Sequence, residues 1–294
     1  MNLINKIAVE NSYSGSDWNF ERTTKYLFEV SGWEIEAGYF EHYRDKTLVK
    51  TVLELPQSYG CPTKCRFCAS ARIERFKPLD AESLEELFLY LYETNNLAEQ
   101  RYVLVTMTGI GDIYFNYANV EKFFLKIRRY NNVYFTISSC LWNANMLRKA
   151  DNLSQQIRMR HVQITYVTDD KEKLGAIIPF YQKYGNGFGD VLHYVAGSTQ
   201  TYYRINYIMI KGVNDEVKDF YKFRDNVKHI ADKVVVRISK LNETLTTKRN
   251  HLHPTDILPM EEFQSILQEA GIKSYIFYAC KNDNMNCGQL ITER

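Results

Sequence analysis

The sequence predicts an α/β fold, a partial (β/α)6 barrel that follows a small N-terminal cap. Apolar runs of strand length alternate with segments whose apolar residues recur at helical spacing. This alternation is typical of a parallel sheet with right-handed crossovers, and about six such units can be counted. The chain has 294 residues, a length that single α/β barrels reach. No Gly-, Pro- or Ser-rich linker divides it.

The predicted strands are rich in β-branched and aromatic residues and are bounded by turn residues. They are residues 35–40, 48–55, 102–107, 133–138, 161–167, 204–210, 233–239 and 272–278. The predicted helices comprise one that Asp80 caps, with Leu84 to Leu91 on one face, and residues 119–130, 142–153, 171–184, 215–231 and 261–270. Residues 185–198 and 241–259 are predicted as loops because they are rich in Gly or polar residues. We place a domain boundary between a cap with lead-in strands, 1–55, and the barrel with its C-terminal tail, 56–294.

Composition and charge limit the choice of partners. The net charge is only +2, so RNA binding would need a local basic patch rather than a global field. Two groups are candidates for such a patch: Arg66, Arg72, Arg75 and Lys77, and Lys248 with Arg249. The sequence has no secretory leader and no apolar run of about 18 residues. We therefore expect a cytoplasmic monomer with no membrane partner.

The motif with the most specific chemistry is a cluster of three thiols, Cys61, Cys65 and Cys68, spaced C-x3-C-x2-C. Thiolates are soft ligands that select zinc, copper(I) or iron–sulfur clusters. Structural zinc takes four protein ligands, and no fourth Cys or His lies nearby. Three thiolates on a cubane cluster leave one iron open for another ligand. The alternative is three ordinary buried cysteines, which is disfavoured because half of the six cysteines lie in this octapeptide.

This spacing resembles the signature of the radical S-adenosylmethionine (SAM) superfamily, as does the aromatic Phe67 before the last Cys. Three more segments, 107–120, 207–215 and the tail Cys-Gly-Gln-Leu at 287–290, resemble those of the radical SAM adenine methyltransferases of ribosomal and transfer RNA. That family includes the chloramphenicol–florfenicol resistance methyltransferases. The resemblance covers the chain from about residue 34 to its end, and it implies a radical SAM partial barrel.

The resemblance also implies cofactors and the residues that hold them. Cys61, Cys65 and Cys68 would bind a 4Fe–4S cluster, and SAM would chelate its open iron. Flavodoxin or ferredoxin would supply the electron that cleaves SAM to a 5′-deoxyadenosyl radical. The residues expected to contact SAM are Gly111, Asp112, Ser138, Thr165 and Asn242. Asp112 replaces a Glu of the family, and Thr165 stands where the family has a different polar segment.

The implied reaction methylates an adenine base of RNA or of a related nucleotide. In the family, a Cys at the position of Cys287 is first methylated, and the radical then activates that methyl group for addition to the base. Glu36 is a candidate general base for the adenine proton. The alternative for Cys287 is a buried cysteine of the tail with no catalytic role, and the alternative for Glu36 is an exposed glutamate on a strand.

One departure from the family leaves other functions open. A second family Cys, which resolves the covalent intermediate, corresponds to Glu54, and a carboxylate cannot form the disulfide. Cys280 or Cys140 could take its place. Alternatively, the enzyme keeps the scaffold and acts on a peptide, nucleoside or other small molecule without a methylated Cys; the short segment before residue 34 also favours this. A third alternative is a non-catalytic protein that binds a cluster or RNA.

Overall fold

The computed structural model describes residues 1–294 except 13–17, 185–186, 201, 280–283, 291 and 293–294. Ten strands form one sheet in the order β1-β2-β3-β4-β7-β8-β9-β10-β11-β12. These strands are β1 (Asn2–Ser12), β2 (Phe20–Val30), β3 (Trp33–Arg44), β4 (Thr47–Glu54), β7 (Val103–Met107), β8 (Val133–Ser139), β9 (Met159–Tyr166), β10 (Tyr203–Met209), β11 (Val234–Lys240) and β12 (Ser274–Phe277). The short strands β5 (Ser58–Tyr59) and β6 (Lys77–Pro78) pair with each other beside it.

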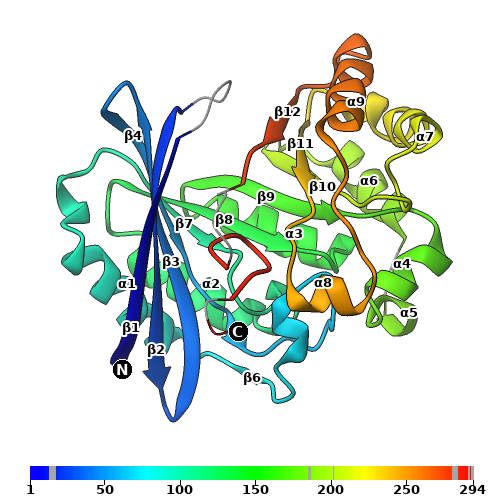
Figure 1. Ribbon diagram of the computed structural model, residues 1–294. Coiled ribbons are helices and arrows are strands. Elements are labelled where there is room, and N and C mark those ends of the chain that lie inside the picture. The colour runs from blue at the N-terminus through cyan, green and yellow to red at the C-terminus, as the bar shows by residue number, and fades with distance from the viewer. Residues whose placement is uncertain (13–17, 185–186, 201, 280–283, 291, 293–294) are drawn as a thin grey trace.

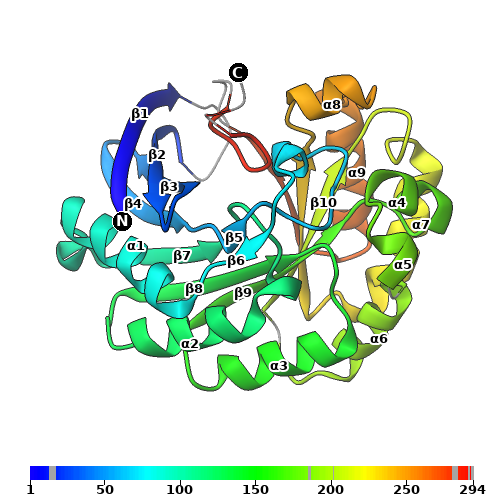
Figure 2. The ribbon, with the colours of Figure 1, turned by 90° about the horizontal axis from the view of Figure 1, so that it is seen from below.

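From β4 to β12 in this sheet, each strand is parallel to the next one. Parallel neighbours need long crossovers, which are supplied mostly by helices on the outer face of the curved sheet (Figure 2). The helices are α1 (Ala81–Thr94), α2 (Tyr117–Ile127), α3 (Ala144–Ser154), α4 (Lys171–Ile177), α5 (Tyr181–Tyr184), α6 (Phe188–Gly197), α7 (Val217–Val227), α8 (Leu245–Arg249) and α9 (Ile257–Glu269). The predicted fold class, an α/β partial barrel, is confirmed. None of these described helices combines the length and apolar character needed to cross a lipid bilayer.

The helices are amphipathic and pack their apolar faces on the sheet. Phe88 on α1, Phe123 and Phe124 on α2 and Phe263 on α9 are fully buried in one continuous core. The predicted cap of α1 is present, because the Asp80 carboxylate accepts a hydrogen bond from the Ser83 amide at 2.7 Å. The outer face of the sheet is therefore sealed by helices, and its inner face is left for other contacts.

The N-terminal strands extend the barrel sheet (Figure 1). β1, β2 and β3 are antiparallel, and β3 pairs with β4, the first strand of the parallel set. The sequence did not predict β1 or β2. β2 lacks strict alternation because it is buried almost throughout, including the polar residues Thr23, Thr24 and Lys25. The domain boundary at residue 55 remains a prediction.

The prediction of a loop over residues 185–198 was wrong. Helix α6 occupies Phe188–Gly197, and Phe188, Val191, Leu192 and Val195 pack their side chains into the core. These apolar residues stand three and four positions apart, so burial outweighs the glycines around them. The predicted loop over residues 241–259 likewise contains the one-and-a-half-turn helix α8.

Candidate functional site

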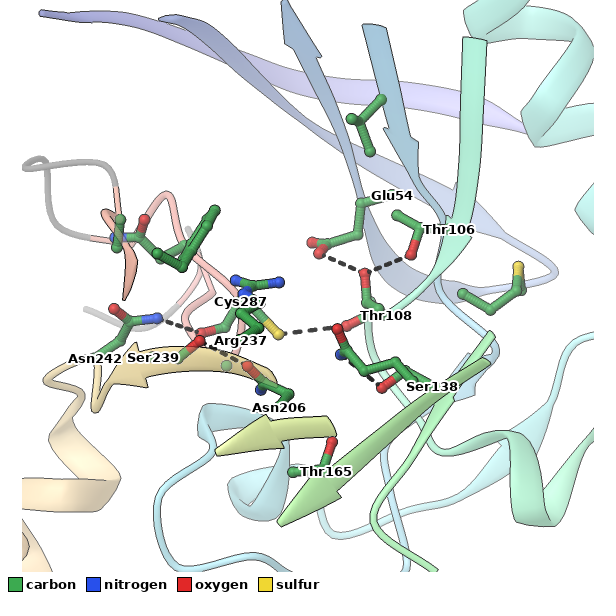
Figure 3. A pocket seen from close by; sticks show the side chains of 18 of the residues that line it. Glu54, Thr106, Thr108, Ser138, Thr165, Asn206, Arg237, Ser239, Asn242 and Cys287 are labelled. Carbon is green, nitrogen blue, oxygen red and sulfur yellow. Dashed lines mark hydrogen bonds between the residues drawn. The ribbon is translucent and has the colours of Figure 1, made fainter. Parts of the chain in front are cut away.

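A cavity of about 820 Å³ lies on the inner face of the curved sheet, between the barrel strands and the C-terminal tail. Side chains alternate across a strand, so every second residue of a barrel strand faces this cavity. On β9 these are His161, Gln163 and Thr165, and on β10 they include Arg204 and Asn206. Figure 3 shows side chains from β4, β7, β8, β9, β10 and β11 and from the tail converging on the cavity. Its volume lies at the upper end of the range for small-molecule sites.

The three predicted thiols all line one end of this cavity. The Thr63 hydroxyl lies 2.9 Å from the Cys61 sulfur and 3.3 Å from the Cys65 sulfur. Lys64, which adopts a left-handed backbone conformation, donates from Nζ to two carbonyls farther along the chain and closes the loop. Burial is the largest cause that raises the pKa of the Cys61 thiol well above its ordinary value. The loop thus brings Cys61, Cys65 and Cys68 to one cavity wall.

No group of three or more His, Cys, Asp or Glu side chains within the described part of the chain is arranged to hold a metal ion. The donor set nevertheless fits an iron–sulfur cluster better than a single ion. Its three sulfur atoms belong to one short loop, and that loop opens onto a cavity with room for a further ligand.

The turn after β7 requires glycine at position 111 and fixes the carboxylate of Asp112. Gly111 has φ 109°, and a Cβ there would clash with the Ser58 hydroxyl. The Asp112 carboxylate accepts hydrogen bonds from the Ser139 hydroxyl at 2.6 Å and from the Cys140 amide at 3.0 Å. Burial raises the pKa of Asp112, and these hydrogen bonds oppose the rise. Asp112 thus joins the ends of β7 and β8 at the thiol end of the cavity.

The other three residues predicted to contact SAM also line the cavity, at the carboxyl ends of later strands. The Ser138 hydroxyl accepts a hydrogen bond from the Gln163 amide at 2.9 Å. Thr165 pairs with Asn206 across β9 and β10. Asn242 donates to the Cys287 carbonyl at 2.9 Å, so this side chain holds the tail.

The C-terminal tail is pinned so that Cys287 lies beside the thiol loop. The Gly288 carbonyl accepts a hydrogen bond at 2.8 Å from the Ala69 amide, the residue directly after the third thiol. Lys25 on β2 donates to the Gln289 carbonyl at 2.8 Å. The N-terminal strands and the thiol loop therefore hold the tail between them, and Cys287 lines the same cavity as the three thiols.

The Cys287 thiol faces Thr108 and Glu54 (Figure 3). Its sulfur lies 3.7 Å from the Thr108 carbonyl oxygen, and the Thr108 hydroxyl donates to the Glu54 carboxylate at 2.9 Å. Although Cys287 keeps accessible surface inside the cavity, burial, followed by the charge of Glu54, raises the pKa of its thiol to about 12. The thiol is therefore protonated at neutral pH, and Glu54 occupies the opposite wall.

Glu36 is a buried cavity residue, so the alternative of a surface carboxylate does not hold. Its carboxylate accepts hydrogen bonds at 3.1 Å from both the amide and the hydroxyl of Thr292, and it lies 3.9 Å from the Lys25 ammonium. In this arrangement Glu36 holds the end of the tail.

Two of the remaining cysteines were candidates for a resolving thiol. Cys140 is half-buried on the cavity wall, with its sulfur 3.4 Å from Asp112, and it interacts with Cys65. It therefore lies with the thiol loop. Cys280 lies outside the described residues.

Sequence reasoning missed the cationic wall of the cavity. Arg204 and Arg237 face the interior from the middle of the sheet, beside Gln163 and Asn206 respectively. A signal was present, since Arg237 interrupts the apolar run of the predicted strand 233–239 and Arg204 begins the predicted strand 204–210. Charged residues are rarely buried without a partner, so such an interruption indicates a functional interior.

Comparison with known proteins supports the resemblance that the motifs predicted. No known family profile matches the chain. The chain is 24% identical over 289 residues to a probable RNA methyltransferase of Rhodopirellula baltica, an alignment that covers 96% of this chain and 73% of that protein. It is 27% identical over 286 residues to a probable dual-specificity RNA methyltransferase RlmN of Pseudothermotoga lettingae, covering 92% and 76%. The RlmN of Listeria monocytogenes is 24% identical over 312 residues, covering 99% and 77%.

Solved structures share the fold. A radical SAM methyltransferase from Sphaerobacter thermophilus superimposes with a TM-score of 0.77 at 18% identity, covering 99% of this chain and 81% of that one. HydG, a maturase of the [FeFe]-hydrogenase, gives a TM-score of 0.58 at 11% identity, covering 79% and 52%. The predicted resemblance to RNA methyltransferases is confirmed by these relatives, and the structural matches show a shared fold.

Proposed function

We propose that this protein is a radical SAM methyltransferase that transfers a methyl group to an adenine base of RNA or of a related nucleotide, with Cys287 as the methyl carrier. The observation that supports this most strongly is the position of Cys287. This residue comes from the far end of the chain, yet it lines the same cavity as the three-thiol loop and is joined to that loop through Gly288 and Ala69.

Each side chain would have a separate task. Cys61, Cys65 and Cys68 would hold a 4Fe–4S cluster, and Gly111, Asp112, Ser138, Thr165 and Asn242 would line the SAM site. When bound, SAM supplies the methyl group and the cluster supplies one-electron chemistry. The chain itself positions the thiol: Asn242 fixes the backbone of Cys287, and Thr108 fixes its sulfur.

A protonated thiol must lose its proton before it can accept a methyl group, because the thiolate is the nucleophile. Arg237 lies near enough to Cys287 to favour the thiolate, and Glu54 opposes it. Glu36 remains the candidate base for the substrate proton, and Glu54 is a second candidate because it shares Thr108 with Cys287. Kinetics of the Glu36→Gln and Glu54→Gln variants would separate them. The variant that lacks the true base should lose turnover but still cleave SAM.

The test is mass spectrometry of the full chain after anaerobic reconstitution with iron, sulfide, reductant and SAM. Trypsin separates Cys287, in residues 282–294, from Cys280, in residues 274–281. We expect one added methyl or methylene group on the Cys287 peptide and none in the Cys287→Ala variant. An unmodified Cys287 peptide in a sample that cleaves SAM to 5′-deoxyadenosine would contradict the carrier role.

A second function is favoured by Glu54. This carboxylate faces Cys287 where the family has a thiol, so a covalent intermediate cannot be resolved there as a disulfide. A radical SAM enzyme with a peptide, nucleoside or other small-molecule substrate and no methylated Cys would have no need of that thiol. The same mass measurement separates the two functions. A cytoplasmic location, a monomeric state and a flavodoxin or ferredoxin donor remain predictions under both.

A further inference from the structure

Basic side chains gather inside the cavity away from the thiol loop. They are Lys50 on β4, Arg160 and His161 on β9, Arg204 on β10 and Arg237 on β11. β9, β10 and β11 are neighbours, and β4 is separated from β9 by two strands of the curved sheet. Nothing in the proposed methyl transfer through Cys287 requires so many cations in one place.

No ion pair to Arg204 or Arg237 forms among the described residues, although the charge of Glu54 reaches Arg237. Arg204 is 9% exposed, and its Nε has no hydrogen-bond partner among the described residues. Its Nη1 makes a long hydrogen bond, 3.5 Å from the Tyr275 hydroxyl. Arg237 also has a buried Nε without a hydrogen-bond partner in the described structure. Its guanidinium carbon lies 3.5 Å from the centroid of the Phe277 ring. Burying charge in this way is costly unless an anion arrives to pair with it.

The basic groups also repel one another. Burial, and then the charges of Arg204, Arg237 and Arg160, lower the pKa of Lys50 to about 7. Burial and the same arginines, with Lys50, lower the pKa of His161 to about 2, so this imidazole stays neutral. Among the described residues, Glu54 interacts with Arg237 and Glu21 interacts with Lys50. These carboxylates offset only part of the charge of the three arginines and Lys50. The interior therefore keeps a positive potential, which a confined cavity focuses.

We propose that Arg204, Arg237, Arg160 and Lys50 form a binding site for a phosphate group inside the barrel. Guanidinium groups present paired N–H donors that match phosphate oxygens, and a phosphate can take donors from several strands at once. A single carboxylate would leave most of these cations unpaired. Neutral His161 adds a further polar group on the same wall.

This inference deepens the proposed function and rests on it, because the phosphate would belong to the nucleotide whose base reaches Cys287. The two regions are contiguous, since Arg237 interacts electrostatically with both Cys287 and Glu54. Arg204 lies on β10 two residues before Asn206, the partner of Arg237, and so is farther from the carboxyl ends of the strands, where the thiol loop lies. The structure thus orders the cavity as thiol loop, Cys287, Arg237 and then Arg204.

The test is calorimetric titration of the full chain with adenosine, AMP, inorganic phosphate and a short adenine-containing RNA. We expect AMP to bind more tightly than adenosine, and added salt to reduce that difference. An RNA that binds more tightly than AMP and competes with it would identify a phosphodiester as the ligand, whereas tighter binding of AMP would identify a free nucleotide. Equal affinities for adenosine and AMP would overturn the inference.

Variants of one arginine make the test specific. Arg204→Met should weaken AMP binding roughly 10- to 100-fold, the range for one charged hydrogen-bonding group, and leave adenosine binding unchanged. Arg204→Lys should restore part of the loss. Arg148→Met on α3, which removes an exposed cation outside the cavity, is the matched control and should bind like the parent chain. Thermal melts establish that each variant is folded, and Lys50→Met provides a second, smaller expected loss. Unchanged AMP binding in both cavity variants would refute the site.

The outcomes separate this inference from the proposed function, because binding is measured without turnover. Phosphate-dependent binding that needs Arg204, together with a Cys287 peptide that stays unmodified, would retain the phosphate site and exclude the methyl-carrier role. A methylated Cys287 with no preference for AMP over adenosine would retain the methyl-carrier role and exclude the phosphate site.

Discussion

Replacing Glu54 by glutamine should make the Cys287 thiol more reactive. Glu54 is the second cause, after burial, of the raised thiol pKa of about 12. Glu54 lies 2.9 Å from the Thr108 hydroxyl, and the Cys287 sulfur lies 3.7 Å from the Thr108 carbonyl oxygen. These two contacts set an upper limit on the distance between Glu54 and Cys287. With backbone dimensions for the span of Thr108, the carboxylate and the sulfur lie on the order of 10 Å apart at most.

The size of the effect follows from Coulomb's law. Two unit charges about 10 Å apart at an effective dielectric constant of about 20 interact by about 1.7 kcal/mol. Because Cys287 keeps accessible surface in the cavity, solvent screens part of this energy. We therefore expect Glu54→Gln to increase the thiolate fraction at a given pH about three- to ten-fold.

The assay is the rate of alkylation by iodoacetamide at pH 8, read from the Cys287 peptide of residues 282–294 by mass spectrometry. Alkylation requires the thiolate, so the rate should rise by the same factor. Glu262→Gln on α9, which removes an exposed carboxylate, should leave the rate unchanged. A rate in Glu54→Gln equal to or below that of the parent chain would show that Glu54 does not act on this thiol.

Three further outcomes are expected. Cys287→Ala should still cleave SAM to 5′-deoxyadenosine but lose methyl transfer to the substrate; retained transfer would exclude the carrier role. Gly111→Ala should destabilise the chain by roughly 1–3 kcal/mol in a urea melt, because φ is 109° and a Cβ would clash with Ser58, whereas Gly189→Ala, with open space around the glycine, should not. Lys50 binds its proton less tightly when folded, with a pKa of about 7, so its contribution to stability should rise with pH between about 7 and the unfolded value of about 10.4. Lys50→Met should flatten the pH dependence of the melt in this window, and an unchanged slope would contradict the placement of Lys50 among cations.

Much of the parallel sheet and its helices could be predicted because their signals are local. Strand Val103–Met107 is a continuous apolar run, and helix Tyr117–Ile127 repeats apolar residues three and four positions apart. β1 escaped prediction because it is a mostly exposed edge strand without an apolar face. β2 escaped it because its burial depends on the tail and on neighbouring strands, as the buried Lys25 shows. Helix α6 escaped it because glycines obscured a four-residue apolar face.

The candidate site divides in the same way. By itself the sequence determined the three-thiol loop and the glycine turn before Asp112, because each is read from neighbours within a few positions. Cys287 was identified by the resemblance of its tail segment to a known family. Only the tertiary structure decided that Cys287 lies across from Glu54, that Glu36 binds the tail, and that Arg204 and Arg237 share one cavity. These relations depend on strand register and on tail docking between segments remote in the chain. No periodicity within one segment encodes such relations, since register is set by the packing of whole strands against one another.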